Sequence, residues 1–267
     1  LTIAGLFTDK IPIQVNVTVH SVLIIALGSI KSLEKFLESM EKVWIKGEKI
    51  DENIEKMTMS DAMQFPIMAG VTLTGLYFSM QYFGKESVNY FILSYIAIGG
   101  TIGVKAMVDS FTAGRFKDYD KDPLVDFKVK LIDLEVYITL MDFPCFFISA
   151  SLMVLYATWK HFILNNIIAL FFCLQSLQTL FIGNFKNGFM LLVLLFFYDI
   201  FFVFGTDVML TVAKGIDAPI KLQFPKDFSG ETNKYAILGL GDIVIPGVFV
   251  SLCLRYDFLK TINQTYF

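Results

Sequence analysis

Long apolar stretches, separated by shorter polar segments, dominate the pattern of residues along the chain. A helix needs about 20 mostly apolar residues to cross the hydrocarbon core of a bilayer. Seven stretches approach that length, and we predict a membrane-spanning helix in each. They are residues 11–30, 65–83, 88–108, 138–157, 162–182, 187–206 and 235–254. The pattern therefore predicts an all-α fold, a polytopic bundle of transmembrane helices.

Two polar segments separate the early stretches. In residues 31–60, apolar side chains such as Leu33, Phe36 and Trp44 recur at helical spacing among many charges. This periodicity predicts an amphipathic helix that lies along the membrane surface or packs on the bundle. A solvated linker helix is the alternative. Residues 109–130 are polar and contain Gly and Pro, which predicts a loop.

Composition supports a membrane environment and excludes several classes of function. Hydrophobic residues make up 55% of the chain, whereas soluble domains contain about 45–50%. The net charge of −3 gives no reason to expect a nucleic-acid partner. The three cysteines are scattered through apolar stretches, which indicates neither a disulfide framework nor a metal site. We expect no metal and no other cofactor.

The distribution of Lys and Arg predicts an orientation in the membrane. Of the 22 basic residues, 14 fall in segments on one side of the predicted bundle and seven on the other side. Cytoplasmic segments are enriched in basic residues. The richer side is therefore predicted to be cytoplasmic, with the N-terminus lumenal or extracellular.

Two aspartates interrupt the apolar interior of the last two predicted spans. Ionisable residues inside a span are costly and mark functional sites. Asp199 lies seven residues before Thr206, where the sixth span is predicted to end. Asp242 lies seven residues after Tyr235, where the seventh span is predicted to begin. Because consecutive spans run antiparallel, we predict both carboxyls about 10 Å below the same membrane face.

The expected chemistry of this pair follows from its apolar surroundings. Two neighbouring carboxyls cannot both ionise comfortably there, so they share one proton near neutral pH. That state suits peptide hydrolysis: the carboxylate takes a proton from water, while the protonated partner polarises the scissile carbonyl. Gly239 and Gly241 leave room beside Asp242 for a neighbouring helix or a substrate backbone. A small-residue packing seam around a buried polar group is the alternative.

The residues around both aspartates resemble a known family, the GxGD intramembrane aspartyl proteases. Tyr198-Asp199 lies in one predicted span and a Gly-Leu-Gly-Asp motif ends at Asp242 in the next. The segments FGTDVMLTVAKGIDAPIKLQFP and LGLGDIVIPGVFVSLCLRYD are most similar to the signal peptide peptidase branch. The similarity extends over most of the chain from Phe65 onward. The motif residues beside the aspartates are Tyr198, Gly239, Leu240 and Gly241.

This resemblance implies a function and a location. Asp199 and Asp242 correspond to the two catalytic aspartates, although the sequence does not tell which one begins as the base. The family hydrolyses remnant signal peptides and type II transmembrane helices within the endoplasmic reticulum membrane. The implied protein is multi-pass, has a lumenal N-terminus, and has the lipid bilayer, transmembrane peptide substrates and a possible second copy of itself as partners.

The chain departs from the family pattern in one respect. Family members have nine spans and a Pro-Ala-Leu motif in the last one, whereas this sequence has about seven predicted spans and no Pro-Ala-Leu. We therefore expect the chain to be part of a longer protein and not to cleave substrates on its own. Within it we predict an N-terminal helical bundle, residues 1–158, and a catalytic part, residues 159–267.

A short strand is predicted in the loop after the sixth span. Residues 220–224 alternate between apolar and polar side chains and are bounded by Pro219 and Pro225. We expect an unfolded substrate segment to pair with the edge of this strand. An ordinary structured loop is the alternative. The candidate pairing residues are Ile220, Lys221, Leu222, Gln223 and Phe224.

Two other functions remain open at this point. One is a presenilin-like catalytic subunit that needs accessory proteins. The other is a transporter or channel in which the paired aspartates relay protons or bind cations. That alternative does not explain the absence of other polar residues lining a pathway through the sixth and seventh spans.

Overall fold

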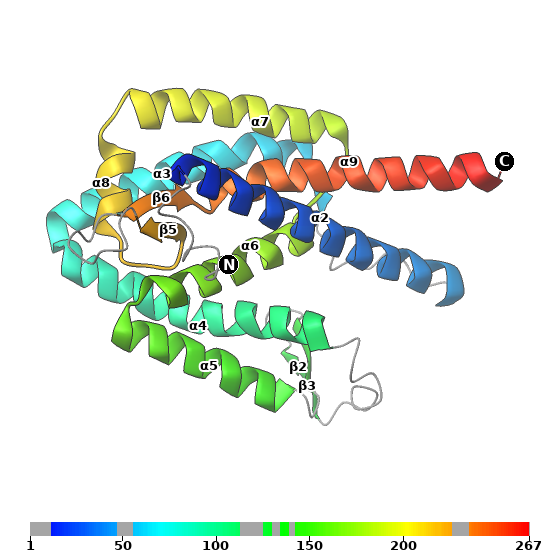
Figure 1. The fold of residues 1–267 in the computed structure, drawn as a ribbon, viewed down its shortest axis with the longest axis horizontal. Helices are drawn as coiled ribbons and strands as arrows, with labels where there is room; N and C mark the ends of the chain where they lie inside the picture. The colour runs from blue at the N-terminus through cyan, green and yellow to red at the C-terminus, as the bar shows by residue number, and fades with distance from the viewer. Residues whose placement is uncertain are drawn as a thin grey trace.

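The computed structural model describes residues 12–46, 56–112, 125–129, 134–138, 142–225 and 235–266. These residues form a bundle of helices (Figure 1). The long helices are α2 (Ile13–Lys46), α3 (Met59–Phe83), α4 (Lys85–Thr112), α5 (Asp142–Trp159), α6 (Phe162–Thr179), α7 (Phe185–Asp199) and α9 (Gly241–Tyr266). Each of the seven predicted spans overlaps one of these helices, which confirms the helical class.

Several helices are suited to a lipid environment. By length and composition alone, three described segments are long and apolar enough to cross a membrane: Ile13–Met40, Phe162–Thr179 and Phe185–Phe204. Large apolar side chains such as those of Phe147 and Phe204 are exposed on the outside of the bundle. An apolar surface of this kind is unfavourable in water and is satisfied by lipid.

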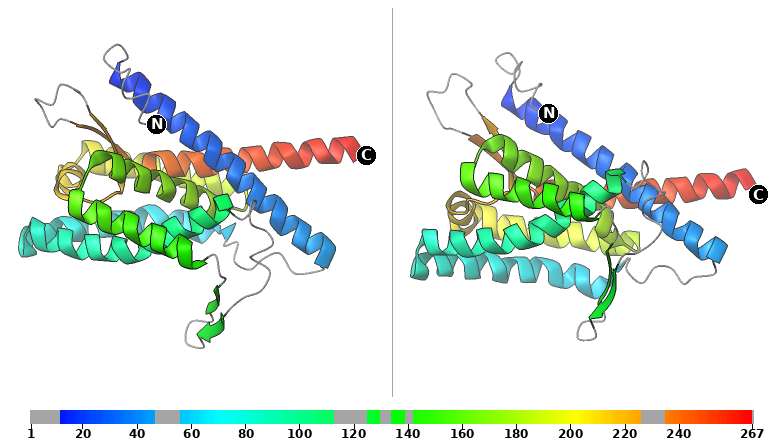
Figure 2. Two further views of the ribbon diagram at one scale, coloured as in Figure 1. Left: turned by 60° about the horizontal axis from the view of Figure 1, so that its bottom comes forward. Right: turned by 90° about the horizontal axis from the view of Figure 1, so that it is seen from below.

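Helix α6 lies at the centre of the bundle. It contacts α2, α4, α5, α9 and strand β5 (Lys221–Pro225), and α2 runs obliquely across the bundle (Figure 2). Leu177 of α6 is fully buried and fits between Gly28 of α2 and Gly247 of α9. A Cβ atom at Gly247 would lie only 2.7 Å from Leu177 Cδ2. The two glycines therefore allow three helices to approach closely, as is common in membrane bundles.

The structure corrects the prediction for residues 31–60. Residues up to Lys46 continue helix α2 without a break, so they do not form a separate amphipathic helix. No proline interrupts Ile13–Lys46, and the packing of Leu177 against Gly28 keeps the helix in place at its one glycine. Residues 47–55 lie outside the part of the chain that the structure describes.

The predicted loop at residues 109–130 is also partly wrong. Strand β2 (Val125–Val129) pairs antiparallel with β3 (Leu134–Ile138). Their backbone hydrogen bonds stabilise a hairpin. The many charged residues in this segment made the sequence predict a loop instead. A second, smaller pairing joins β1 (Lys56–Met57) in parallel to β4 (Phe181–Ile182).

The seventh predicted span is corrected at its start. Residues 235–239 form strand β6 (Tyr235–Gly239), which pairs antiparallel with β5. Helix α9 begins only afterwards: the carbonyl of Leu240 accepts hydrogen bonds from Ile243 N at 3.1 Å and Val244 N at 2.9 Å. Glycines have a low helix propensity, and the backbone of this segment is instead satisfied by β5. The short strand predicted at residues 220–224 is confirmed, shifted by one residue.

Candidate active site

Asp199 is the last residue of helix α7, where the helix changes its winding. A π-helical turn, η2 (Ile200–Phe204), follows directly, and such turns occur often at functional sites. The preceding Tyr198 contacts Phe202, with ring centroids 4.7 Å apart. A Cβ at Gly70 of α3 would lie 3.0 Å from the Phe202 ring and 3.8 Å from the Tyr198 ring. The two rings therefore pack on α3, while the Asp199 side chain is exposed.

Asp242 lies in the first turn of helix α9, directly after strand β6. This position differs from the prediction that Asp242 lies seven residues inside a helix, because residues 235–239 are extended. The first turn of a helix has free N–H groups and a partial positive charge, which favour a carboxylate. A Cβ at Gly239 would lie 3.4 Å from Asp242 Oδ2. The absence of a side chain at Gly239 therefore keeps one side of this carboxyl open.

Asp199 and Asp242 lie within electrostatic range of each other. Helices α7 and α9 are in contact, and a Cβ at Gly188 of α7 would lie 2.8 Å from Phe249 Cδ2 of α9. A small residue thus allows the helices that contain both carboxyls to approach. Both side chains are exposed on the surface of the described residues, where neighbouring side chains do not cover them.

Strand β5 is anchored to helix α6 by two adjacent asparagines. Asn165 Nδ2 donates to Lys221 O at 2.6 Å. Asn166 Nδ2 donates to Gln223 O and its Oδ1 accepts from Gln223 N, both at 2.8 Å. These two asparagines also fit the family resemblance, but no pattern in the sequence predicts their partners. Their signal in the sequence is a pair of amides at the start of an otherwise apolar span.

The candidate pairing residues do not all face the same environment. Leu222 and Phe224 are buried in the core of the bundle, and the Lys221 side chain is buried as well. Lys221 Nζ donates to the carbonyls of Ala213 and Ile216 at 2.8 and 2.7 Å, at the end of helix α8 (Val208–Gly215). Burial lowers the pKa of Lys221, partly opposed by the charge of Asp217. These side chains therefore fix the hairpin in place.

The two outer edges of the β5–β6 hairpin differ. The outward backbone groups of Lys221 and Gln223 are bonded to the asparagines of α6. Gln223 is opposite Ile237 in the antiparallel register. Residues opposite each other in an antiparallel pair direct their backbone N–H and C=O groups either both toward or both away from the partner strand. Because the backbone groups of Gln223 point away from β6, the backbone groups of Ile237 point away from β5. No described strand lies on that outer side of β6, and Ile237 is about half exposed, at 48%.

Pro246 changes the hydrogen bonding of the first turns of α9. It has no N–H group, so the carbonyl of Asp242, four residues earlier, lacks its usual helical donor. That carbonyl is therefore an additional acceptor next to the carboxyl pair. Among the described residues, no group of three His, Cys, Asp or Glu side chains is placed to bind a metal ion. The site offers acid–base chemistry through the two carboxyls.

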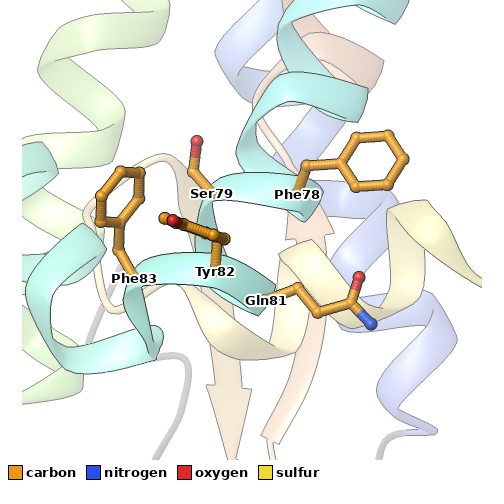
Figure 3. Close-up of a pocket in the computed structure, with 5 residues that line it drawn as sticks. All are labelled: Phe78, Ser79, Gln81, Tyr82 and Phe83. Atoms are coloured by element: carbon orange, nitrogen blue, oxygen red, sulfur yellow. The ribbon is translucent and has the colours of Figure 1, made fainter.

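A separate pocket of about 500 Å³ lies at the C-terminal end of α3 (Figure 3). Aromatic rings dominate it, with Tyr82 and Phe83 in edge-to-face contact at 5.0 Å. Its lining contains no carboxyl and none of the candidate site residues, and we assign it no role in the chemistry. It is lined by Phe78, Ser79, Gln81, Tyr82 and Phe83.

Comparisons with known proteins relate the chain to intramembrane proteases by sequence. The chain is 39% identical over 235 residues to signal peptide peptidase of Homo sapiens, an alignment that covers 83% of this chain and 62% of that protein. It is 46% identical over 151 residues to intramembrane protease 2 of Caenorhabditis elegans, which covers 53% of this chain and 32% of that protein. No solved structure matches the chain significantly.

The family assignment follows from the extent of these matches. The chain spans about 62% of the length of the human relative. The family model described as signal peptide peptidase matches residues 49–267, which include both aspartates and the β5–β6 hairpin. The chain therefore belongs to the signal peptide peptidase family.

Proposed function

We propose that the protein is an intramembrane aspartyl endopeptidase in which Asp199 and Asp242 activate a water molecule. The observation that supports this most directly is that two exposed carboxyls, on the contacting helices α7 and α9, lie within electrostatic range of each other in an otherwise apolar region. The substrates we propose are remnant signal peptides and type II transmembrane helices. The relatives' names, signal peptide peptidase and intramembrane protease, agree with this class.

In the proposed reaction the pair holds one proton. The ionised carboxylate takes a proton from water as the water oxygen attacks the scissile carbonyl carbon. The protonated carboxyl donates a hydrogen bond to the carbonyl oxygen and stabilises the tetrahedral oxyanion. Collapse of this intermediate breaks the C–N bond, and the leaving amine takes the proton that the base received. No covalent enzyme intermediate forms.

Substrate binding is proposed to use the hairpin next to Asp242. A helical substrate must unfold locally before its peptide bond becomes accessible, and an extended segment can add to a strand edge. The free edge of the hairpin is on β6, because the outer edge of β5 is bonded to Asn165 and Asn166. We therefore place the pairing at Ile237 and retain residues 220–224 as the strand that supports it.

The remaining features of the proposal concern the whole protein. We propose a multi-pass protein of the endoplasmic reticulum membrane with its N-terminus on the lumenal side. Residues 1–158 would form the N-terminal bundle and residues 159–267 the catalytic part, with the helices that contain Asp199 and Asp242 both in the second unit. We propose that homo-oligomers form and that no metal or cofactor takes part.

Cleavage of a type II signal-anchor peptide by the full-length protein in liposomes tests the proposal. Asp199→Asn and Asp242→Asn should each abolish cleavage, since each removes one of the two proton-transfer groups. Asp207→Asn is the matched control, because Asp207 is an exposed aspartate three residues after the end of η2. Cleavage by either of the first two variants at the level of the control would refute the catalytic assignment.

A further inference from the structure

We infer that the end of the bundle opposite the aspartates contains a binding site for an anionic phospholipid headgroup, with Arg255 of α9 as its main ligand. Helices α7 and α9 run antiparallel (Figure 1). Arg255 lies 13 residues after Asp242, which is about 20 Å along α9. The start of α7 lies a similar distance from Asp199. The site is therefore separate from the carboxyl pair and does not depend on the proposed protease activity.

Arg255 is a buried cation with no anionic partner among the residues that the structure describes. Only 5% of its surface is exposed. Its Nε donates to Ser251 O at 3.2 Å, and its guanidinium carbon lies 4.5 Å from the centroid of the Phe181 ring. Its Nη2 atom has no hydrogen-bond partner among the described residues. An unsatisfied buried guanidinium is strongly unfavourable, so its free donors indicate an anion that is bound from outside.

The guanidinium lines a pocket of about 400 Å³ between α2, α9 and the β4–α7 connection. The pocket combines one cation with an apolar lining, and none of its lining residues is acidic. An arginine by itself would attract any anion. The apolar residues that line the rest of the pocket favour an anion that is joined to an acyl glycerol. The lining residues are Phe36, Ser39, Met40, Phe181, Ile182, Gly183, Asn184, Phe185, Leu252, Arg255, Tyr256 and Leu259.

The N-terminus of helix α7 opens into the same pocket. Asn184 is the N-cap residue of α7, and its side chain makes no capping hydrogen bond. The first N–H groups of a helix have no partner within the helix and favour an anion. Gly183, Asn184 and Phe185 all line the pocket. A phosphate between Arg255 and the start of α7 would satisfy donors from both helices.

The position of the pocket fits the level of lipid headgroups. Apolar residues of α9 end near Arg255, and Asp257 and Lys260 follow within the next turn and a half. Tyr256 is half exposed beside the pocket, and tyrosines are enriched at the membrane interface. Phe185 and Leu259 line the pocket and are 41% and 37% exposed, so its apolar lining is partly open to the surroundings. The ligand is therefore a phosphodiester lipid with a net negative charge.

Lipid binding by the full-length protein in detergent micelles tests this inference. The probes are dioleoylphosphatidylglycerol and dioleoylphosphatidylcholine, which share the phosphodiester and differ in net charge, together with inorganic phosphate. Native mass spectrometry measures the bound lipid, and the unfolding temperature reports stabilisation. We expect retention of phosphatidylglycerol, weaker retention of phosphatidylcholine, and no competition from inorganic phosphate at millimolar concentration.

Three variants locate the site. Arg255→Gln should weaken phosphatidylglycerol binding about tenfold or more, because charge-assisted hydrogen bonds are lost. Asn184→Asp keeps an equally good N-cap but places a negative charge in the pocket, so it should weaken binding even if Arg255→Gln fails to fold. Lys260→Gln removes an exposed charge further along α9 and should change binding less than twofold.

Three results would overturn the inference. Unchanged phosphatidylglycerol binding in folded Arg255→Gln and Asn184→Asp would show that the lipid binds elsewhere. Competition by inorganic phosphate as effective as competition by the lipid would replace the headgroup with a free anion. The unfolding temperature of Arg255→Gln could also be lower than that of wild type by the same amount with and without added lipid. That result would show that the guanidinium binds a group of the protein and not a lipid.

Discussion

Helices α6 and α7 follow each other in the chain, and both contain polar residues in apolar surroundings, yet they use them differently. Asn165 of α6 is 1% exposed and bonded to the backbone of β5 at 2.6 Å. Asp199 of α7 is exposed at a helix end, within electrostatic range of a second carboxyl. The amide has a fixed structural partner, whereas the carboxyl lies in the site where we propose that a substrate binds. A polar residue inside a span is therefore structural when the fold supplies its hydrogen-bond partner, and it is a candidate functional residue when the fold does not.

The largest expected effect is a loss of cleavage activity in α7 without a matching loss of stability. Asp199→Asn should lower the rate of substrate cleavage at least about 10³-fold, because a proton-transfer group is lost. The free energy of unfolding should stay within about 0.5 kcal/mol of wild type, as for an exposed residue outside structural networks. The rate is measured with a signal-anchor peptide in liposomes and the stability in mixed micelles. A large loss of stability would mean that Asp199 has a structural role like that of Asn165.

The second expected effect concerns the packing of α6. Leu177→Ala should destabilise the bundle by about 2–5 kcal/mol, because it leaves a cavity between the glycines of α2 and α9. Leu180→Ala, at the partly exposed end of the same helix, is the matched control. Unfolding in mixed micelles, followed by circular dichroism, measures both. Equal effects of the two substitutions would contradict the central position of Leu177.

A third, smaller effect tests the anchor between α6 and the hairpin. Asn165→Ala should destabilise the protein by about 1–3 kcal/mol, because a buried carbonyl of β5 loses its donor. It should also slow cleavage, since the hairpin supports the first turn of α9. Gln175→Ala is the control, because the Gln175 amide bonds only one turn away to Thr179. Wild-type cleavage by Asn165→Ala would separate the hairpin from the active site.

The smallest effect is a dependence on pH. Burial lowers the pKa of Lys221 below its ordinary value of 10.5. Between the folded and unfolded pKa values the unfolded chain binds more protons, so stability rises with pH in that window. The contribution is complete above pH 10.5 and is lost as the pH falls through the folded pKa. Relative to Lys221→Met, the wild-type protein should therefore gain stability as the pH approaches 10.5 from below.

The matched control for this pH dependence is Lys214→Met, which removes an exposed lysine from helix α8. Thermal unfolding of the three proteins between pH 7 and pH 10.5 gives the comparison. A stability difference between wild type and Lys221→Met that is the same at every pH would indicate that Lys221 is not shielded from solvent.

Much of the fold could be predicted from the distribution of apolar residues. The length of each apolar stretch is tied directly to the thickness of the bilayer, and every predicted span overlaps a helix. The boundaries were less predictable. Residues 31–46 look amphipathic but continue α2, because hydropathy does not reveal whether a helix ends at the membrane surface. Residues 235–239 look like part of a span, but they are a strand because β5 lies beside them.

The same division applies to the candidate site. The sequence by itself determined the carboxyl pair, since charged residues in apolar spans and the Gly-Leu-Gly-Asp motif are local features. Only the tertiary structure decided that Asp242 starts a helix, that asparagines of α6 bond the outer edge of β5, and that the Nη2 of Arg255 lacks a partner in a pocket. Each of these depends on which distant backbone or side chain satisfies a polar group, and no local pattern of residues encodes that choice.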